Sequence, residues 1–362
     1  MEIKKAILHI IDREAGSLIC SQTELDLKEY AVKQYLDSVL KRLEKAEYKT
    51  GILNQESEFY RLVTNEELDF VDKSSEMAQM LFDSLAISED APSGDLLVVE
   101  LAELNGTPKL GMIKFNYKPS FTHHVTYIED KLQNNSILNK TIFPSTTQRI
   151  DECCLINLKT FDLELVEKKY SFEGQNRLFF SERFLQVDPK PTVTENLKII
   201  KKAVKEVANR YNEEEYVSMS QTQQAIFESI EEDGIISKEK IAEAVFENNE
   251  SAKKEYYEMI EQTKFSEEIP SNVPKYEKKY SKQKFKLTNG IELSIPTDIF
   301  KDKELIEFIN NPDGTISVMI KNVEEVNKKG RKKRENSQEE VMNEDQQYKF
   351  FVDLRHDKEV LE

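Results

Sequence analysis

Two segments near the start of the chain repeat apolar residues at helical spacing. In residues 26–46 the apolar positions are Leu27, Tyr30, Ala31, Tyr35, Leu36, Val39, Leu40 and Leu43. Charged side chains occupy the opposite face of the same segment. Residues 70–85 follow a similar pattern, with Met77, Met80, Leu81 and Leu85 on one side. Both segments are therefore predicted to form amphipathic helices with one face towards a core.

Other segments predict strands and hairpins. Residues 3–11 are mostly apolar, and 17–21 are a suitable hairpin partner for them. Residues 95–104 are joined to 109–117 through Asn105-Gly106, and an Asn-Gly pair is a strong hairpin signal. Residues 153–159 and 163–170 are further candidate strands. The first part of the chain therefore combines helices with an antiparallel sheet.

The pattern changes after the prolines at 189 and 191. Residues 194–211 predict a long helix with Thr194 as its cap. Residues 212–268 hold 16 acidic residues against 5 lysines, and they predict two or three helices with a break at Gly234. Beyond residue 274 we expect a hairpin at 285–295 around Asn289-Gly290, a short helix or strand at 304–310, and a strand at 315–321 after the turn at 311–314. Residues 348–354 resemble a last strand or a docking segment.

These elements predict an α+β protein with three parts. Residues 1–210 form an N-terminal domain of mixed helices and antiparallel sheet. Residues 211–326 form a C-terminal domain of acidic helices and a basic β-hairpin. Residues 327–362 form a charged, partly mobile tail. A length of 362 residues is enough for two hydrophobic cores.

Charge is strongly segregated along the chain. The formal net charge is −17, yet residues 275–334 carry 15 basic and 9 acidic groups, or +6. Most of these cations fall in two clusters. The first basic cluster is Lys275, Lys278, Lys279, Lys282, Lys284 and Lys286, and the second is Lys328, Lys329, Arg331, Lys332, Lys333 and Arg334. Because the acidic excess already supplies solubility, the clusters indicate a surface for an anionic partner, most simply nucleic acid phosphate.

Strand parity sharpens the interpretation of the first cluster. Lys278, Lys282, Lys284 and Lys286 share parity, so a strand extending back to residue 278 would place them on one face. Such a row, with ammonium groups about 6.6–7 Å apart, can follow a phosphate backbone without reading bases. The alternative is a solvated sheet face or a lysine-protected edge. The second cluster contains Gly330 and has the character of a flexible basic segment, whose alternative partner is one of the chain's own acidic regions.

Several other chemistries find little support. Three cysteines without a framework spacing are expected to be reduced thiols. No apolar run approaches the ~18 residues of a membrane span, and no secretory signal is recognisable, so we expect a cytoplasmic protein. His123 and His124 are adjacent and are expected on the surface, while His9 is expected to be a hydrogen-bonded core residue. No Walker loop, dinucleotide-binding fingerprint, Cys-x-x-Cys motif or nucleophile elbow is present.

A metal-dependent nuclease would have to be built on Asp95, Glu100 and Lys114. Asp95 and Glu100 are five residues apart on one predicted strand and so face opposite sides. We interpret them as solvated carboxylates at a strand edge. We therefore predict no enzyme, no catalytic residue, no bound metal and no cofactor.

The order of segments resembles the bacterial nucleoid-associated protein family of the NdpA/YejK type. The resemblance begins with Ile7-Leu-His-Ile-Ile-Asp12 and Ser21-x-x-Glu24-Leu25. It continues through the 94–99 strand, Ile113-Lys-Phe115, Ile156-x-Leu158 and Phe179-Phe-Ser-Glu-Arg-Phe-Leu185, and ends with the hairpin and Asp313-Gly314 pattern at 285–321. The matches span residues 3–325. The resemblance implies association with the nucleoid and binding to double-stranded DNA, and it supplies no catalytic or DNA-contacting residues.

The leading hypothesis is therefore non-enzymatic, largely sequence-independent binding of double-stranded DNA by the two basic clusters. An alternative is an interaction or defence-type adaptor whose acidic helices at 213–268 bind a protein partner. A metal-dependent nuclease is a third hypothesis. A homodimer also stays open, since a helix such as 26–46 suits a dimer seam as well as an internal core.

Overall fold

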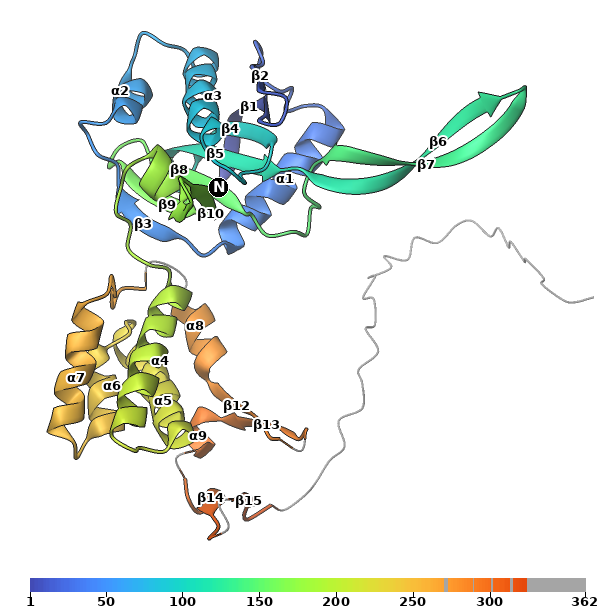
Figure 1. Cartoon of the computed structure of the whole chain (residues 1–362). Coiled ribbons are helices and arrows are strands. Elements are labelled where there is room, and N and C mark those ends of the chain that lie inside the picture. The colour runs from blue at the N-terminus through green and yellow to red at the C-terminus, as the bar shows by residue number, and fades with distance from the viewer. Residues whose placement is uncertain (270–272, 289, 301, 313–314, 324–362) are drawn as a thin grey trace, which may run out of the picture. The chain divides into compact units, whose positions relative to one another are not determined.

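The computed structural model describes residues 1–269, 273–288, 290–300, 302–312 and 315–323 (Figure 1). By compactness the chain divides into a first unit, Met1–Lys301, and a second unit that begins at Asp302. The mixture of helices and antiparallel sheets confirms the predicted α+β class.

A seven-stranded antiparallel sheet organises the first part of the first unit, with strand order β2-β1-β4-β5-β8-β9-β3. Its strands are β1 (Glu2–Asp12), β2 (Ser17–Ile19), β3 (Lys49–Ile52), β4 (Gly94–Ala102), β5 (Pro108–Asn116), β8 (Glu152–Asn157) and β9 (Asp162–Val166). A small hairpin of β10 (Lys169–Phe172) and β11 (Gln175–Leu178) follows. The predicted pairings of β1 with β2 and of β4 with β5 are confirmed.

Both faces of this sheet are covered. One face packs against α2 (Glu58–Thr64), α3 (Phe70–Ala86) and the π-helix η1 (Phe179–Phe184). The other face packs against α1 (Tyr30–Lys45), whose Leu36, Val39 and Leu43 are buried. Burial on both sides explains why β4, β5 and β8 are nearly continuous apolar runs rather than alternating ones.

A second hydrophobic core lies in the helices that follow. They are α4 (Val193–Arg210), α5 (Glu215–Asp233), α6 (Lys238–Phe246), α7 (Glu250–Glu261) and α8 (Val273–Tyr280). The buried face of α4 belongs to this core, although the predicted domain boundary lies after α4 at residue 210. That boundary stays a prediction. The hairpin β12 (Lys282–Lys286) and β13 (Glu292–Pro296), with the short α9 (Thr297–Phe300), completes the first unit.

Local capping explains where these helices begin. The cap of α4 lies earlier than predicted, because Thr192 rather than Thr194 caps the helix and forms a reciprocal capping box with Glu195. Ser237 caps α6 through the backbone N–H of Lys240. Gly234 ends α5 in the left-handed conformation, with φ of 68°, as the predicted break requires.

The second unit is described by itself. It holds β14 (Ile306–Asn310) paired with β15 (Ile316–Ile320). This pairing resolves the ambiguity at 304–310 in favour of a strand. The Asn289 and Asp313-Gly314 turn positions, the second basic cluster, the 327–362 tail and the 348–354 segment lie outside the described residues.

The sequence did not predict the ribbon of β6 (Lys118–Ile128) and β7 (Lys131–Ile142). Figure 1 shows it as a long twisted pair of strands that leaves the seven-stranded sheet after β5. His123 and His124 lie on β6 and are exposed, which confirms their predicted surface position.

The core position predicted for His9 is also confirmed. Its Nε2 lies 3.0 Å from Ser74 Oγ, and its Nδ1 accepts a hydrogen bond from the Ser21 backbone N–H at 3.2 Å. Burial lowers the pKa of His9 to about 4. The ring is therefore neutral in the folded protein at neutral pH.

This burial predicts a pH dependence of stability. Below the unfolded-state pKa of about 6.5, His9 is protonated in the unfolded chain but stays neutral in the folded one. The free energy of unfolding therefore falls by up to about 1.4 kcal/mol per pH unit as the pH drops towards 4. We expect His9→Gln to be less stable at pH 7 but to lose less stability between pH 6.5 and 4. Urea denaturation of both proteins across this range measures the difference. Parallel pH profiles would contradict the assignment.

Candidate nucleic-acid interface

The first basic cluster lies on a segment anchored by its apolar side. Tyr276 and Tyr280 are four residues apart on α8, and both are buried in the helical core. On β12, Gln283 is buried and donates through Nε2 to Ser220 O at 3.3 Å, while Phe285 stacks on Phe300 with ring centroids 5.5 Å apart. The inward side of the segment is thus fixed on both elements.

The lysines occupy the opposite side of these elements. Lys278 and Lys279 are exposed on α8, and Lys282, Lys284 and Lys286 are exposed on β12 in strict alternation. These five residues are called the exposed lysine face below. Lys275 also lies on α8, where only its backbone is described.

The strand predicted to include Lys278 is shorter than expected. The strand does not extend back to residue 278, because α8 continues to Tyr280. The row on a single strand face therefore consists of Lys282, Lys284 and Lys286, and Lys278 is presented by a helix. The turn between the two elements is held by backbone hydrogen bonding, with Thr297 N donating to Ser281 O at 2.9 Å.

Few carboxylates oppose the exposed lysine face. In the register of the hairpin, Lys282 lies opposite Pro296, Lys284 opposite Ser294 and Lys286 opposite Glu292. Within the described parts of the chain, none of the five lysines forms an ion pair. The lysines of α6 and α7, by contrast, are ion-paired: Lys240 binds Glu232 and Asp233, and Lys253 binds Glu243 and Glu250. Unpaired ammonium groups on one face favour an external anion.

The fold adds a neighbour that the sequence analysis missed. Lys201 on α4 and Lys279 on α8 both approach the Tyr280 ring, with Nζ 5.8 Å and 5.5 Å from its centroid. Burial, followed by the charge of Lys279, lowers the pKa of Lys201. Two cations held near one ring extend the positive surface to α4. The repeat of lysines at 198, 201, 202 and 205 was the available signal.

The lysines of α4 differ in their partners. Lys202 pairs with Glu206 at 3.7 Å and Lys205 with Glu215 at 2.6 Å. Lys198 is exposed, and neither it nor Lys201 forms an ion pair with any residue that the structure describes. Lys201, which lies beside Lys279, thus joins α4 to the exposed lysine face, and Lys198 lies one helical turn before it.

The expected environment of the nuclease candidates is wrong. Asp95 is not a solvated edge residue: β4 lies between β1 and β5, and Asp95 is buried and accepts a hydrogen bond from Tyr117 Oη at 2.7 Å. Burial raises the pKa of Asp95. Glu100 instead pairs with Lys5 at 3.4 Å, so the two carboxylates do not converge.

Lys114 belongs to a fully buried polar cluster. Its Nζ lies 3.5 Å from Glu152 Oε2, which also accepts from Asn116 Nδ2 at 2.6 Å and Tyr170 Oη at 2.7 Å. Burial lowers the pKa of Lys114, and the Glu152 charge opposes that shift. Across the residues that the structure describes, no group of three His, Cys, Asp or Glu side chains is placed to hold a metal ion. The cluster is therefore interpreted as a structural one.

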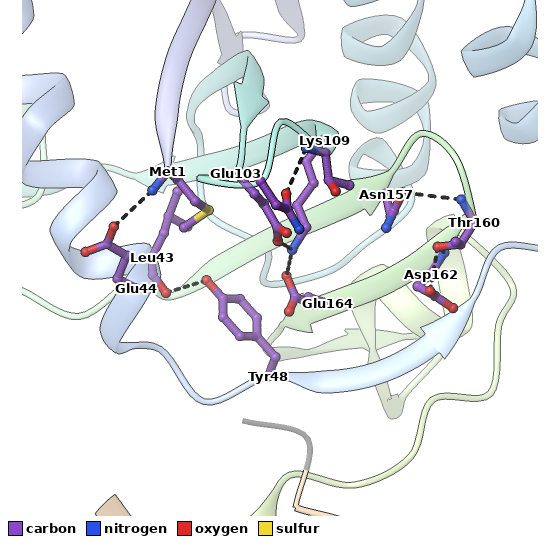
Figure 2. A network of polar contacts seen from close by, with 12 residues as sticks. Met1, Leu43, Glu44, Tyr48, Glu103, Lys109, Asn157, Thr160, Asp162 and Glu164 are labelled. Atoms are coloured by element: carbon purple, nitrogen blue, oxygen red, sulfur yellow. Dashed lines mark hydrogen bonds and ion pairs between the residues drawn. The ribbon is translucent and has the colours of Figure 1, made fainter. Parts of the chain in front are cut away.

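A surface cavity of about 430 Å³ is a further candidate for a ligand site. One of its lining residues, Lys109, pairs with Glu103 at 2.7 Å and with Glu164 at 2.8 Å, and Figure 2 shows it between them. Burial lowers the pKa of Lys109, but hydrogen bonds to the two carboxylates outweigh it and raise the pKa overall. Tyr48 Oη donates to the Leu43 carbonyl oxygen at 2.6 Å. These groups satisfy one another, and the arrangement offers neither a nucleophile nor a free base.

Comparison with known proteins identifies a family for this chain. The family model for nucleoid-associated protein YejK matches residues 7–328. The chain belongs to this family. Membership of the nucleoid-associated family confirms the resemblance found in the sequence, and the match includes both α4 and the exposed lysine face. A comparison with curated proteins gave no match. Among the described helices, none combines the length and apolar character that crossing a membrane requires.

A structural role for the buried cluster predicts a large effect on stability. Glu152→Gln removes the counter-charge of Lys114 and should lower the free energy of unfolding by about 3–5 kcal/mol, the cost typical of breaking a buried ion pair. Glu100→Gln breaks the half-exposed pair with Lys5 and should cost less than about 1 kcal/mol. Urea denaturation of both variants makes the comparison. Equal effects would show that Glu152 does not carry a buried charge pair.

Proposed function

We propose that this protein binds double-stranded DNA largely without sequence preference, as a non-enzymatic component of the bacterial nucleoid. The observation that carries the proposal is the exposed lysine face, five cations without ion-pair partners among the described residues of a chain whose net charge is −17. Family membership supports DNA as the anion and the nucleoid as the location in the cytoplasm.

The geometry favours contact with phosphates over contact with bases. Lys282, Lys284 and Lys286 stand about 6.6–7 Å apart along one strand face and end in flexible point charges. Lysine can donate to guanine in the major groove, but the exposed lysine face has no Arg, Asn or Gln side chain for the other bidentate base contacts. Binding through such a surface is driven by counterion release and depends strongly on salt.

The second basic cluster, Lys328–Arg334, would add further phosphate contacts. It contains six cations and no acid, so its contribution is also expected to be electrostatic and independent of sequence. Lys275 is assigned to the interface on charge and on its position in α8.

The acidic helices give weaker support to the adaptor alternative. Many of their carboxylates are engaged within the chain, since Glu215, Glu232 and Glu243 are each held by a lysine. A protein partner for these helices would have to compete with those lysines.

The nuclease hypothesis has a simple test: incubation with plasmid and Mg²⁺ or Mn²⁺ should leave the plasmid intact.

Loss of the exposed lysine face should weaken the binding of DNA. Replacing Lys278, Lys279, Lys282, Lys284 and Lys286 by Gln should weaken duplex binding, because fewer DNA phosphates are then neutralised. The slope of log K against log salt should become shallower by about 0.9 for each phosphate that the variant no longer neutralises. Fluorescence anisotropy with a duplex at four or more salt concentrations measures both quantities.

A matched control removes the same charge elsewhere. Lys28, Lys33, Lys41, Lys45 and Lys159 are exposed lysines of the N-terminal part, and replacing them by Gln also removes five charges. The control variant should keep most of the original chain's slope of log K against log salt. If the two quintuple variants change the slope equally, the effect is one of net charge and the mapped interface is wrong.

The second prediction separates the lysines of α4. The double variant Lys198→Gln/Lys201→Gln should weaken duplex binding several-fold, because both side chains are available for phosphate. Lys202→Gln/Lys205→Gln removes amines already held by Glu206 and Glu215, so its effect should be smaller. The same anisotropy titration compares them, and a reversed order would exclude α4 from the interface.

A further inference from the structure

The β6–β7 ribbon has no role in the DNA-binding surface described above, yet its structure is specific. Ten cross-strand pairs run from Lys118–Ile142 at the root to Ile128–Lys131 at the tip. A two-stranded ribbon is marginally stable in water by itself, and stability normally needs further strands or a packed face. The ribbon therefore requires an explanation of what covers it.

The two faces of the ribbon differ in chemistry. The side chains on one face, called the apolar ribbon face, are Phe121, His123, Val125, Tyr127, Leu132, Asn134, Ser136 and Leu138. Phe121 is 75% exposed, Tyr127 76% and Leu132 59%. The opposite face carries Thr122, His124, Thr126, Ile128, Lys131, Gln133, Asn135 and Ile137. Large exposed apolar side chains gathered on one face indicate an interaction surface.

The root of the ribbon is firmly attached to the sheet body. Phe143, just after β7, stacks on Tyr35 of α1 at 5.4 Å and contacts Phe115 of β5 at 5.8 Å. Tyr35 Oη donates to Pro144 O at 3.3 Å, and Arg42 donates to Ser145 O at 3.3 Å. The ribbon is thus presented by a packed base rather than by a loose loop.

Charge argues against DNA as the partner of this face. Between residues 118 and 142 the ribbon has three lysines, Lys118, Lys131 and Lys140, and two carboxylates, Glu129 and Asp130. Both carboxylates stand at the tip, where approach to a duplex would bring them close to phosphate. The apolar ribbon face has no lysine, arginine or carboxylate. A contact that is apolar and uncharged suits protein better than a polyanion.

The same neutrality favours a second copy of this chain. Two copies with a net charge of −17 each repel one another, so their contact must lie where the surface carries no net charge. The apolar ribbon face meets this condition, because none of its side chains carries a formal charge.

The residue pattern is also self-complementary. Consider two ribbons stacked face to face and related by a two-fold axis that lies in the contact plane, perpendicular to the strands, midway between His123 and Val125. This axis places Phe121 over the partner's Tyr127 and Leu138 over the partner's Leu132. Near the axis, Ser136 contacts the partner's Asn134, and His123 contacts the partner's Val125. Each end of the face then buries aromatic and leucine side chains, and the polar amide and hydroxyl meet each other. An isologous contact needs a pattern of this kind.

We propose that the apolar ribbon face packs, with the ribbons antiparallel, against the same face of a second copy. The face spans seven residues, or about 23 Å, and two strands, or about 10 Å. An interface of this size falls below the standard 1,200–2,000 Å² of stable complexes, so the association should be weak and concentration-dependent.

Two double variants of the full chain test the proposal. Tyr127→Asp/Leu132→Asp places carboxylates on a cross-strand pair of the apolar ribbon face, and Thr126→Asp/Gln133→Asp places them on the adjacent pair of the opposite face. Both add the same charge in the same local geometry. Sedimentation velocity over a concentration series, with thermal denaturation to check folding, should show self-association of the original chain. The first variant should weaken it at least tenfold and the second less than threefold.

Other outcomes overturn the proposal in distinct ways. An original chain that stays monomeric up to about 1 mM has no such contact. Equal weakening by both variants excludes the apolar ribbon face as the contact. If Tyr127→Asp/Leu132→Asp lowers duplex affinity at protein concentrations where the chain is monomeric, the face contacts DNA instead. None of these results depends on the exposed lysine face, whose failure would appear in the salt slope.

A cysteine experiment tests the antiparallel arrangement, in a Cys20→Ser background. An equal mixture of Phe121→Cys and Tyr127→Cys chains should form a dimer crosslinked by a bismaleimide that spans about 10 Å, the usual distance between packed sheets, while each chain alone should form at least fivefold less. Equal yields from the separate chains would contradict the antiparallel register.

Discussion

The proposed function of this chain depends on the one-sided burial of a short basic segment. Tyr276, Tyr280 and Gln283 are held in the interior, and this anchoring directs the intervening lysines outward. Without that anchor the lysines would have ready partners, because the chain carries 68 acidic residues against 51 basic ones. Confinement of unpaired cations to one surface would allow an acidic protein to bind a polyanion, since long-range repulsion is screened within about 10 Å at 0.1 M salt.

Two buried lysines of the N-terminal part are ion-paired within the chain. Lys114 is paired with Glu152 in the sheet, and Lys109 is held by Glu103 and Glu164 at the surface cavity. The apolar ribbon face carries no charged side chain, which separates it chemically from both the acidic bulk and the exposed lysine face. Binding to DNA and association between copies would then use surfaces of different character.

Much of the fold could be predicted because its signals are local. The Asn105-Gly106 hairpin and the helical spacing of residues 70–85 depend on turn chemistry and periodicity alone. Parity correctly placed Lys282, Lys284 and Lys286 on one face, but extending it to Lys278 ignored the helical spacing of Tyr276 and Tyr280. The ribbon was missed because Glu129-Asp130 at its tip is not a typical hairpin turn sequence. The nearness of Lys201 to Lys279 and the burial of Asp95 depend on tertiary packing, which no local pattern reports.

A lysine footprint tests the central account most directly. The full chain is treated with an amine-acetylating reagent, with and without a duplex of mixed sequence at low salt, and modification at each lysine is quantified by mass spectrometry. The account predicts that DNA protects Lys278, Lys279, Lys282, Lys284 and Lys286, with Lys198 and Lys201, while Lys28, Lys33 and Lys41 of the N-terminal part react as before. Protection spread evenly over all lysines, or confined to the N-terminal part, would contradict it.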